Sequence, residues 1–283
     1  MSWTWPTGPF PTHNDGFFWT DMSSSVCDRG IEPDREITEQ EIRNAKLAVG
    51  YVANQMNIPV VGRQNEGKSS LINALKGLRP GDPGRAAVGE SETTKVPTAF
   101  RDERHAGVVW HDIPGGGTSN FSAWGYYYAH KLYAYDQILL VHSSALSEVR
   151  SILLARCPGC NCHIFRIKLT ARQLDVRIMQ LYVYMKKEYV VARTKADQHI
   201  RNCKRNKRHT SVSDAREDFL RQVWEDTNQV TAKTSEMGTL HIKFTDFVIS
   251  EMGVLQMVNG EPTSEDPYEG IIDEERFLRQ LGL

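Results

Sequence analysis

One eight-residue segment constrains this chain more than any other: Gly62–Ser69 reads G-x-x-x-x-G-K-S. It comes directly after the apolar run Ile58–Val61 and opens a helical pattern over Ser69–Leu78. Where a strand turns through glycines into a helix, successive backbone N–H groups converge on one point, and the helix dipole adds positive potential there. The segment therefore predicts an α/β fold with an anion site at the carboxyl end of a sheet strand.

The rest of the chain repeats this strand-then-helix pattern. The apolar runs that indicate strands are Ile58–Val61, Val108–Trp110, Ile138–Val141, Tyr189–Ala192 and Phe247–Ile249. Helical patterns lie between them over Ser69–Leu78, Leu174–Met185 and Asp214–Trp224. Runs that are apolar throughout are typical of strands buried on both faces. We therefore expect a mostly parallel central sheet flanked by helices.

The chemistry expected at Gly62–Ser69 is the binding of a nucleoside triphosphate, as in P-loop proteins. Lys68 is expected to reach the β- and γ-phosphates, and the Ser69 hydroxyl to ligate Mg²⁺. The other residues assigned to the nucleotide in this turn are Gly62, Asn65, Glu66, Gly67 and Ser70.

A second motif, Asp112-Ile113-Pro114-Gly115, follows the strand-like run that ends at Trp110. An acidic side chain at that strand end can hold Mg²⁺ through water, and the Gly115 N–H can sense the γ-phosphate. The motif is weak alone, but its place after a buried strand favours this function. Asp112 is therefore a predicted metal ligand and Gly115 a predicted nucleotide contact.

Between these motifs lies the segment Glu92–Lys95, which reads E-T-T-K. One threonine hydroxyl is expected to complete the Mg²⁺ shell only when GTP is bound, which would order the segment and act as a switch. Spacing does not decide between Thr93 and Thr94. We assign Thr94 as the metal ligand and place it, with Lys68 and Ser69, in the catalytic set.

The segment Thr194-Lys195-Ala196-Asp197 is close to the N-K-x-D guanine signature. The Asp197 carboxylate offers two acceptors to the N1–H and N2–H₂ donors of guanine, whereas adenine presents an acceptor at N1. Asp197 is therefore expected to select guanine, and Lys195 to cover the ring face. Thr194 stands where Asn is usual, which is expected to remove a contact to the base. Ser250, at the end of DFVIS, is a candidate for the last base-contacting loop.

No residue of the second motif is an obvious water-positioning group for hydrolysis. Many small GTPases carry Gln directly after the switch glycine, but this position is Gly116, followed by Gly117 and Thr118. An arginine finger in the same chain cannot be assigned either. We expect slow intrinsic turnover, with stimulation by a second GTPase molecule across a nucleotide-facing dimer.

In order along the chain, GRQNEGKSSLINALKGL, ETTKVP, WHDIPGGGT and TKAD resemble the immunity-related (interferon-inducible) GTPases, within the dynamin-like wider group. The T-K-x-D variant and the Gly-rich second switch are features of that family. The match covers about residues 40–255. The resemblance implies GTP hydrolysis stimulated by dimerisation or oligomerisation, often with peripheral association at intracellular membranes.

The sequence divides into a flexible leader at 1–33, an N-terminal helix at 34–56 that packs on the core, a P-loop GTPase domain at 57–255 and a C-terminal tail at 256–283. Thr38 and Glu41 have capping-box spacing at the start of the first helix. Its apolar stripe consists of Ile42, Ala45, Val49, Val52 and Met56. The tail holds a short helical pattern at Asp273–Leu281. Because the family usually carries a substantial helical domain built from both chain ends, this extension is interpreted as reduced.

Residues 149–173 are an atypical insertion, and two interpretations of it are a zinc site and a retained intron. Cys157, Cys160, Cys162 and His163 supply four zinc-ligand types, but all of them fall within seven residues, a poor geometry for tetrahedral zinc. A retained intron translated in frame is the second, because a Val codon begins with GT and Gln can be encoded CAG. Its removal leaves a connection of ordinary length for an α/β unit. If the segment is native, lowered local stability is expected.

Charge and composition exclude several classes of protein. A net charge of −1 gives no global attraction to nucleic acid, so no nucleic-acid partner is expected. No apolar run approaches the ~20 residues that span a bilayer. Five cysteines, an odd number, do not resemble a secreted disulfide framework. We therefore expect a cytoplasmic protein.

These motifs together predict a protein that binds GTP or GDP with Mg²⁺ and hydrolyses GTP to GDP and phosphate as a conformational switch, stimulated by self-association. The alternative is a nucleotide-binding interaction module without useful turnover, which Gly116 and the reduced helical region both favour.

Overall fold

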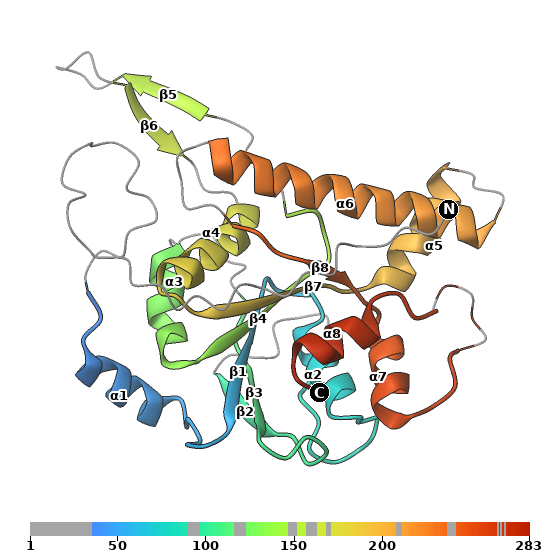
Figure 1. The fold of residues 1–283 in the computed structure, drawn as a ribbon, viewed down its shortest axis with the longest axis horizontal. Helices are drawn as coiled ribbons and strands as arrows, with labels where there is room; N and C mark the ends of the chain where they lie inside the picture. The colour runs from blue at the N-terminus through green and yellow to red at the C-terminus, as the bar shows by residue number, and fades with distance from the viewer. Residues whose placement is uncertain are drawn as a thin grey trace.

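The structure is a computed structural model that describes residues 36–89, 97–115, 123–146, 152–156, 163–167, 171–207, 211–236, 242–264, 266, 268 and 270–283 (Figure 1). The predicted leader at 1–33, the switch residue Thr94 and the three cysteines of the proposed zinc cluster lie outside these residues.

A six-stranded sheet forms the centre of the molecule, in the order β2-β3-β1-β4-β7-β8. The strands are β1 (Met56–Val61), β2 (Thr98–Arg101), β3 (Val108–Asp112), β4 (Gln137–His142), β7 (Glu188–Arg193) and β8 (Asp246–Val248). Every neighbouring pair is parallel except β2 and β3. The five predicted strands and the mostly parallel α/β fold are confirmed. The edge strand β2 was not predicted, because its residues are largely exposed and carry no apolar run.

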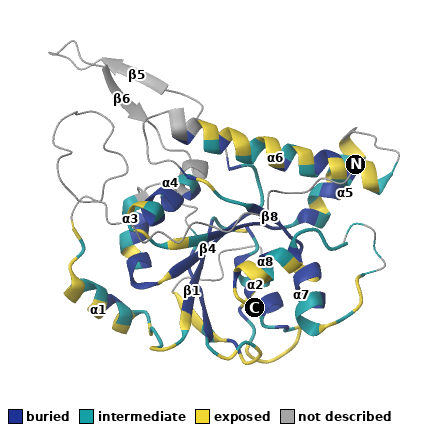
Figure 2. Ribbon diagram, in the orientation of Figure 1, coloured by how far each residue is buried: buried dark blue, intermediate teal, exposed yellow. Residues whose placement is uncertain are grey.

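Helices cover both faces of this sheet (Figures 1 and 2). On one face, α2 (Lys68–Leu75), α7 (Glu251–Asn259) and α8 (Glu274–Gln280) bury Leu71, Val254 and Phe277 in a common cluster with Val60. On the other, α1 (Glu39–Ala48), α3 (Ala123–Ala129), the 3-10 turn η1 (Leu132–Ala134) and α4 (Ala171–Tyr184) pack in a second cluster that includes Val61. Consecutive residues of a buried strand face opposite layers, which explains the continuous apolar runs.

Two further helices, α5 (Ala196–Lys207) and α6 (Val212–Glu236), pack on each other and bury a third cluster around Phe219 and Val248. This cluster lies at the β8 edge of the sheet. Figure 1 shows α6, the longest of the described helices, crossing that side of the molecule.

The N-terminal helix is shorter than the predicted span of residues 34–56. The Thr38–Glu41 capping box is confirmed, and Ala45 is buried in the core. The helix ends at Ala48, because Gly50 follows with a φ of 68° that a helix cannot continue. Met56, predicted to lie on the helical stripe, instead begins β1.

The predicted insertion contains a separate two-stranded antiparallel sheet, β5 (Ile152–Arg156) and β6 (His163–Ile167). These strands pair with each other and with none of the six central strands in the described part of the chain. Figure 1 shows the hairpin projecting away from the central sheet.

The predicted domain boundary at residue 255 falls inside α7, and the predicted tail helix is α8, whose Phe277 is buried in the core. None of the helices in the described residues is both long and apolar enough to cross a membrane.

Candidate nucleotide-binding site

The predicted motifs meet at one edge of the sheet. Gly62 follows β1, Asp112 ends β3, Thr194 follows β7 and Ser250 comes two residues after β8. Because these strands are parallel, their carboxyl ends lie along the same edge, where ligands bind in open α/β sheets.

The turn after β1 has the backbone that a phosphate cradle requires. Gly62, Asn65 and Gly67 have φ values of 152°, 61° and 87°. A Cβ atom on Gly62 would lie 2.1 Å from the carbonyl O of Val141 in β4, so only glycine fits there. Gly67 caps α2 without a side-chain hydrogen bond. The first N–H groups of that helix therefore have no competing side-chain cap and suit an anion.

The two predicted magnesium ligands in the described residues lie together. Ser69 Oγ donates a hydrogen bond of 2.6 Å to Asp112 Oδ2, and Asp112 is buried. A hydroxyl and a carboxylate side by side are oxygen ligands of the kind that Mg²⁺ takes, so the residues present fit the ion. Lys68 is buried, with 8% of its surface exposed, and its Nζ donates to the carbonyl O of Arg63 at 2.8 Å.

Gly115 directly contacts the turn Gly62–Ser69, which is called the phosphate turn from here on. A Cβ atom on Gly115 would lie 2.7 Å from the backbone N of Gln64. The Asp112–Gly115 motif is therefore in contact with the turn at both of its ends, through Ser69 and through Gln64. Thr94 and Gly116 lie outside the described residues.

The predicted base-recognition segment, Thr194–Asp197, is hydrogen-bonded to the same turn. Thr194 Oγ1 donates to the carbonyl O of Glu66 at 2.6 Å, and Lys195 Nζ donates to the carbonyl O of Asn65 at 2.6 Å. Lys195 has a φ of 60°, a left-handed conformation uncommon for lysine. The sequence predicted only that Thr194 removes a contact to the base. It did not predict the hydrogen bond to Glu66, because a partner 128 residues away leaves no local signal.

The remaining predicted base residues differ in their surroundings. Asp197 lies half-buried in the first turn of α5. Ser250 is buried, and its hydroxyl accepts a hydrogen bond from Gly253 N as the N-cap of α7.

The Glu66 carboxylate in the phosphate turn is also buried, 3.9 Å from the Arg63 guanidinium. Glu66 can therefore offer the nucleotide its backbone rather than its side chain.

A buried ionic cluster underlies the base-recognition segment, and no sequence motif pointed to it. His142 Nε2 lies 2.8 Å from Asp246 Oδ1, and Arg193 Nε donates to Asp246 Oδ2 at 2.9 Å. Burial opposes ionisation of Asp246, but the adjacent His142 and Arg193 hold its pKa below the usual range. Burial also opposes the imidazolium, yet the Asp246 carboxylate raises the pKa of His142. The cluster joins the last residues of β4 and β7 to the first residue of β8.

A second buried carboxyl, Asp175 in α4, lies within electrostatic reach of the phosphate turn and of His142. Burial raises its pKa to about 7, and the negative charge of Glu66 acts in the same direction. The positive charges of His142, Arg63 and Lys68 oppose this shift. Asp175 therefore holds a proton close to neutral pH, which its place in the sequence did not indicate.

The model of the "Interferon-inducible GTPase (IIGP)" family matches residues 24–157. Interferon-inducible GTPase 1 of Mus musculus is 28% identical over 167 residues, which cover 59% of this chain and 34% of that protein. Interferon-inducible GTPase 5 of Rattus norvegicus is 33% identical over 118 residues, covering 42% and 26%. The chain thus spans about a quarter to a third of the length of these relatives.

Among solved structures, Era of Aquifex aeolicus bound to GDP and AlF₄⁻ is 17% identical, with a TM-score of 0.37 over 74% of this chain and 57% of that one. With the family match and the motif geometry in hand, the predicted resemblance is confirmed: the chain is similar to the interferon-inducible, immunity-related GTPases.

Proposed function

We propose that this chain binds GTP and GDP with Mg²⁺ and hydrolyses GTP to GDP and phosphate as a conformational switch. The observation that carries the proposal is that the phosphate turn is hydrogen-bonded to both other motifs. Ser69 donates to Asp112 of the second motif, and Thr194 of the base-recognition segment donates to the carbonyl O of Glu66. A nucleotide lying along this edge would contact the residues proposed to bind its phosphates, its Mg²⁺ and its base, and these residues are hydrogen-bonded to one another.

Each residue has a distinct part in this proposal. The backbone N–H groups after Gly62 and the Lys68 ammonium would hold the phosphates, and Asp197 would select the guanine edge. Ser69 and Asp112 would hold Mg²⁺, which offsets the negative charge that develops on the phosphate oxygens. Thr94 would join them when GTP is bound.

Turnover is proposed to be slow in the isolated chain and faster on self-association through the nucleotide face. Gly116 follows the switch glycine, so the position where many small GTPases carry Gln has no side chain to orient water. The same residue supports the alternative, an interaction module that binds nucleotide without useful turnover. Peripheral association with intracellular membranes is proposed from the family resemblance alone.

Nucleotide titration of purified protein tests the binding proposal. Wild-type protein should bind GDP with Mg²⁺ and discriminate strongly against ADP. Lys68→Met should weaken GDP binding at least about a hundredfold, because charge-assisted hydrogen bonds to phosphate are lost. Lys76→Met is the matched control, since Lys76 follows the same helix but donates to the carbonyl O of Gly84.

Phosphate release across protein concentrations separates the two functions. Turnover per molecule that rises with concentration supports the self-stimulated GTPase. Tight GDP binding with flat, near-zero release supports the interaction module. Equal affinity for GDP and ADP would refute the guanine-nucleotide proposal itself.

For the domain organisation, we propose that residues 149–173 are an insertion in the GTPase domain and that this insertion contains the hairpin β5–β6. A retained intron remains one origin for it. Sequencing of the transcripts tests this hypothesis. A segment that is present in every spliced message would refute it.

A further inference from the structure

The segment around Asp273 is bonded to the outer edge of β8. Ile249 N donates to Arg193 O on β7, so the N–H groups of Val248 and Ser250 point away from β7. Val248 N donates to Asp273 Oδ2 at 3.1 Å, and Asp273 N donates back to Val248 O at 3.3 Å. The chain around Asp273 thus occupies the place that a further strand would take.

The next residue, Glu274, holds the turn that follows β8. One of its carboxylate oxygens, Oε1, accepts hydrogen bonds from Ser250 N at 2.9 Å and from Ser250 Oγ at 3.3 Å. The other oxygen, Oε2, accepts from Ile272 N at 2.5 Å. The space around it is filled, since a Cβ atom on Gly253 would lie 2.5 Å from Oε1.

Glu274 is an unusual residue to find at this place. It is 0% exposed, and no ion pair between described residues includes it. Burial raises its pKa, and the backbone N–H groups of Ser250 and Ile272 act in the opposite direction. A buried carboxyl held by N–H and O–H donors satisfies groups that would otherwise lack partners. Its contacts therefore serve the geometry of the turn.

This turn touches the base-recognition segment. Ala196 N, between Lys195 and Asp197, donates to the carbonyl O of Ile249 at 3.2 Å. Any shift of the Ile249–Ser250 turn would therefore move the backbone that carries Asp197. The path from Glu274 to Asp197 runs through two hydrogen bonds, Ser250 N to Glu274 Oε1 and Ala196 N to Ile249 O. It is completed by one step along the chain from Ser250 to Ile249 and one from Ala196 to Asp197.

We propose that Glu274 is a positioning residue for guanine recognition: it fixes the Ile249–Ser250 turn and, through it, Asp197. This inference rests on the proposed function. Its consequence is that the C-terminal segment sets how long a guanine nucleotide stays bound and how well the 2-amino group of guanine is read. Inosine diphosphate lacks that amino group, so the ratio of GDP to IDP affinity reports the placement of Asp197.

Glu274→Gln is the central variant, because it keeps the size of the side chain but turns one acceptor oxygen into an amide that cannot accept. Ser250 N or Ile272 N then loses its partner. The dissociation of fluorescent GDP should become about tenfold faster, and the GDP/IDP affinity ratio should fall by a similar factor. Glu274→Ala should have a larger effect in the same direction where it folds.

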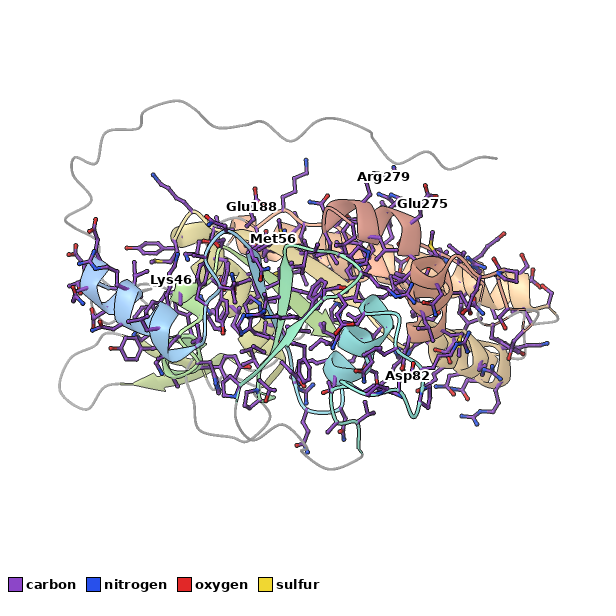
Figure 3. The ribbon with its side chains drawn as sticks, turned by 90° about the horizontal axis from the view of Figure 1, so that it is seen from below. Lys46, Met56, Asp82, Glu188, Glu275 and Arg279 are labelled. Carbon is purple, nitrogen blue, oxygen red and sulfur yellow. The ribbon has the colours of Figure 1, made fainter. Side chains whose placement is uncertain are left out.

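Two controls separate positioning from general stability. Glu275→Gln changes the next residue, whose side chain is 66% exposed and pairs with Arg279 at 2.7 Å on the outer surface of α8 (Figure 3). It should leave the dissociation rate and the ratio unchanged. Phe277→Leu changes a core contact of the same helix and should lower the melting temperature without lowering the GDP/IDP ratio.

The inference is overturned if Glu274→Gln retains the wild-type dissociation rate and ratio, or if Phe277→Leu lowers the ratio as much. A wild-type protein that binds no GDP would instead refute the proposed function, and this inference would fall with it.

Discussion

The Thr194 hydroxyl donates a hydrogen bond of 2.6 Å to the carbonyl O of Glu66, and so joins the base-recognition segment to the phosphate turn. In the proposed function these two loops hold opposite ends of one nucleotide, and this hydrogen bond fixes them relative to each other. Such preorganisation lowers the ordering cost of binding.

Removal of this hydroxyl should weaken nucleotide binding. Thr194 is 5% exposed, so Thr194→Val keeps the shape but leaves the buried Glu66 carbonyl without this donor. GDP dissociation should become about tenfold faster, because an unsatisfied buried acceptor costs about 1–3 kcal/mol. Thr194→Ser keeps the hydroxyl and should stay close to wild type. Stopped-flow displacement of fluorescent GDP measures both, and equal rates for the Val and Ser variants would contradict the role of the hydroxyl.

Gly62→Ala should destabilise the fold. The added methyl group would overlap the carbonyl O of Val141, 2.1 Å away, and backbone of a central strand cannot move aside cheaply. The free energy of unfolding should fall by at least about 3 kcal/mol in urea denaturation. Gly81→Ala is the control: its φ of 96° carries similar backbone strain, but nothing lies within 4 Å of the new Cβ. A loss no larger than that of the control would show that the contact with β4 is unimportant.

Asp197→Asn should change the preferred base. An asparagine amide can donate to the 2-carbonyl of xanthine, whereas it cannot accept both donors of guanine. GDP affinity should fall about a hundredfold and xanthosine diphosphate affinity should rise, since buried polar groups left unpaired penalise the wrong ligand. Competition binding measures the two affinities, with Gln198→Ala, an exposed neighbour, as control. An unchanged preference for GDP would remove Asp197 from the base site.

Asp175 should make the protein less stable as the pH rises. Its pKa is about 7 in the folded chain, mainly because it is buried, and near 3.8 in the unfolded chain. Between these values the unfolded chain releases a proton that the folded chain retains, so stability falls across this window and the full loss is present above pH ~7. The raised pKa of His142 has the same sign, because its contribution is present below pH ~6.5 and is lost at higher pH.

Asp175→Asn should therefore increase the free energy of unfolding at pH 8 by on the order of a few kcal/mol, with little gain at low pH. Urea denaturation at pH 4.5 and pH 8 measures the difference. Glu217→Gln on the exposed side of α6 should change neither value. The same gain at both pH values would mean that titration of Asp175 is not the cause.

The sequence predicted the parts of the fold that depend on local patterns. The runs that became β1, β3, β4, β7 and β8 are buried on both faces, so their apolar residues are continuous and visible without a structure. The start of α1 was predicted because Thr38 and Glu41 are three residues apart. Its end was not, because the apolar spacing continued beyond Gly50 by chance.

The parts of the site that were missed depend on distant residues. Glu274 reaches Ser250 across 24 positions, and Thr194 reaches Glu66 across 128. Nothing in the neighbourhood of either residue marks such a partner, since the contact exists only after the strands are ordered. Asp175 was missed for a related reason: its acidity depends on burial, which its sequence neighbours do not specify.

The hairpin β5–β6 shares no ladder with the six central strands among the described residues. A gene that loses or gains the codons for residues 149–173 would therefore leave every hydrogen-bonded strand pair of the central sheet intact. Two splice forms with the same central sheet are physically compatible with this topology, and they would differ in the hairpin and in the first three residues of α4.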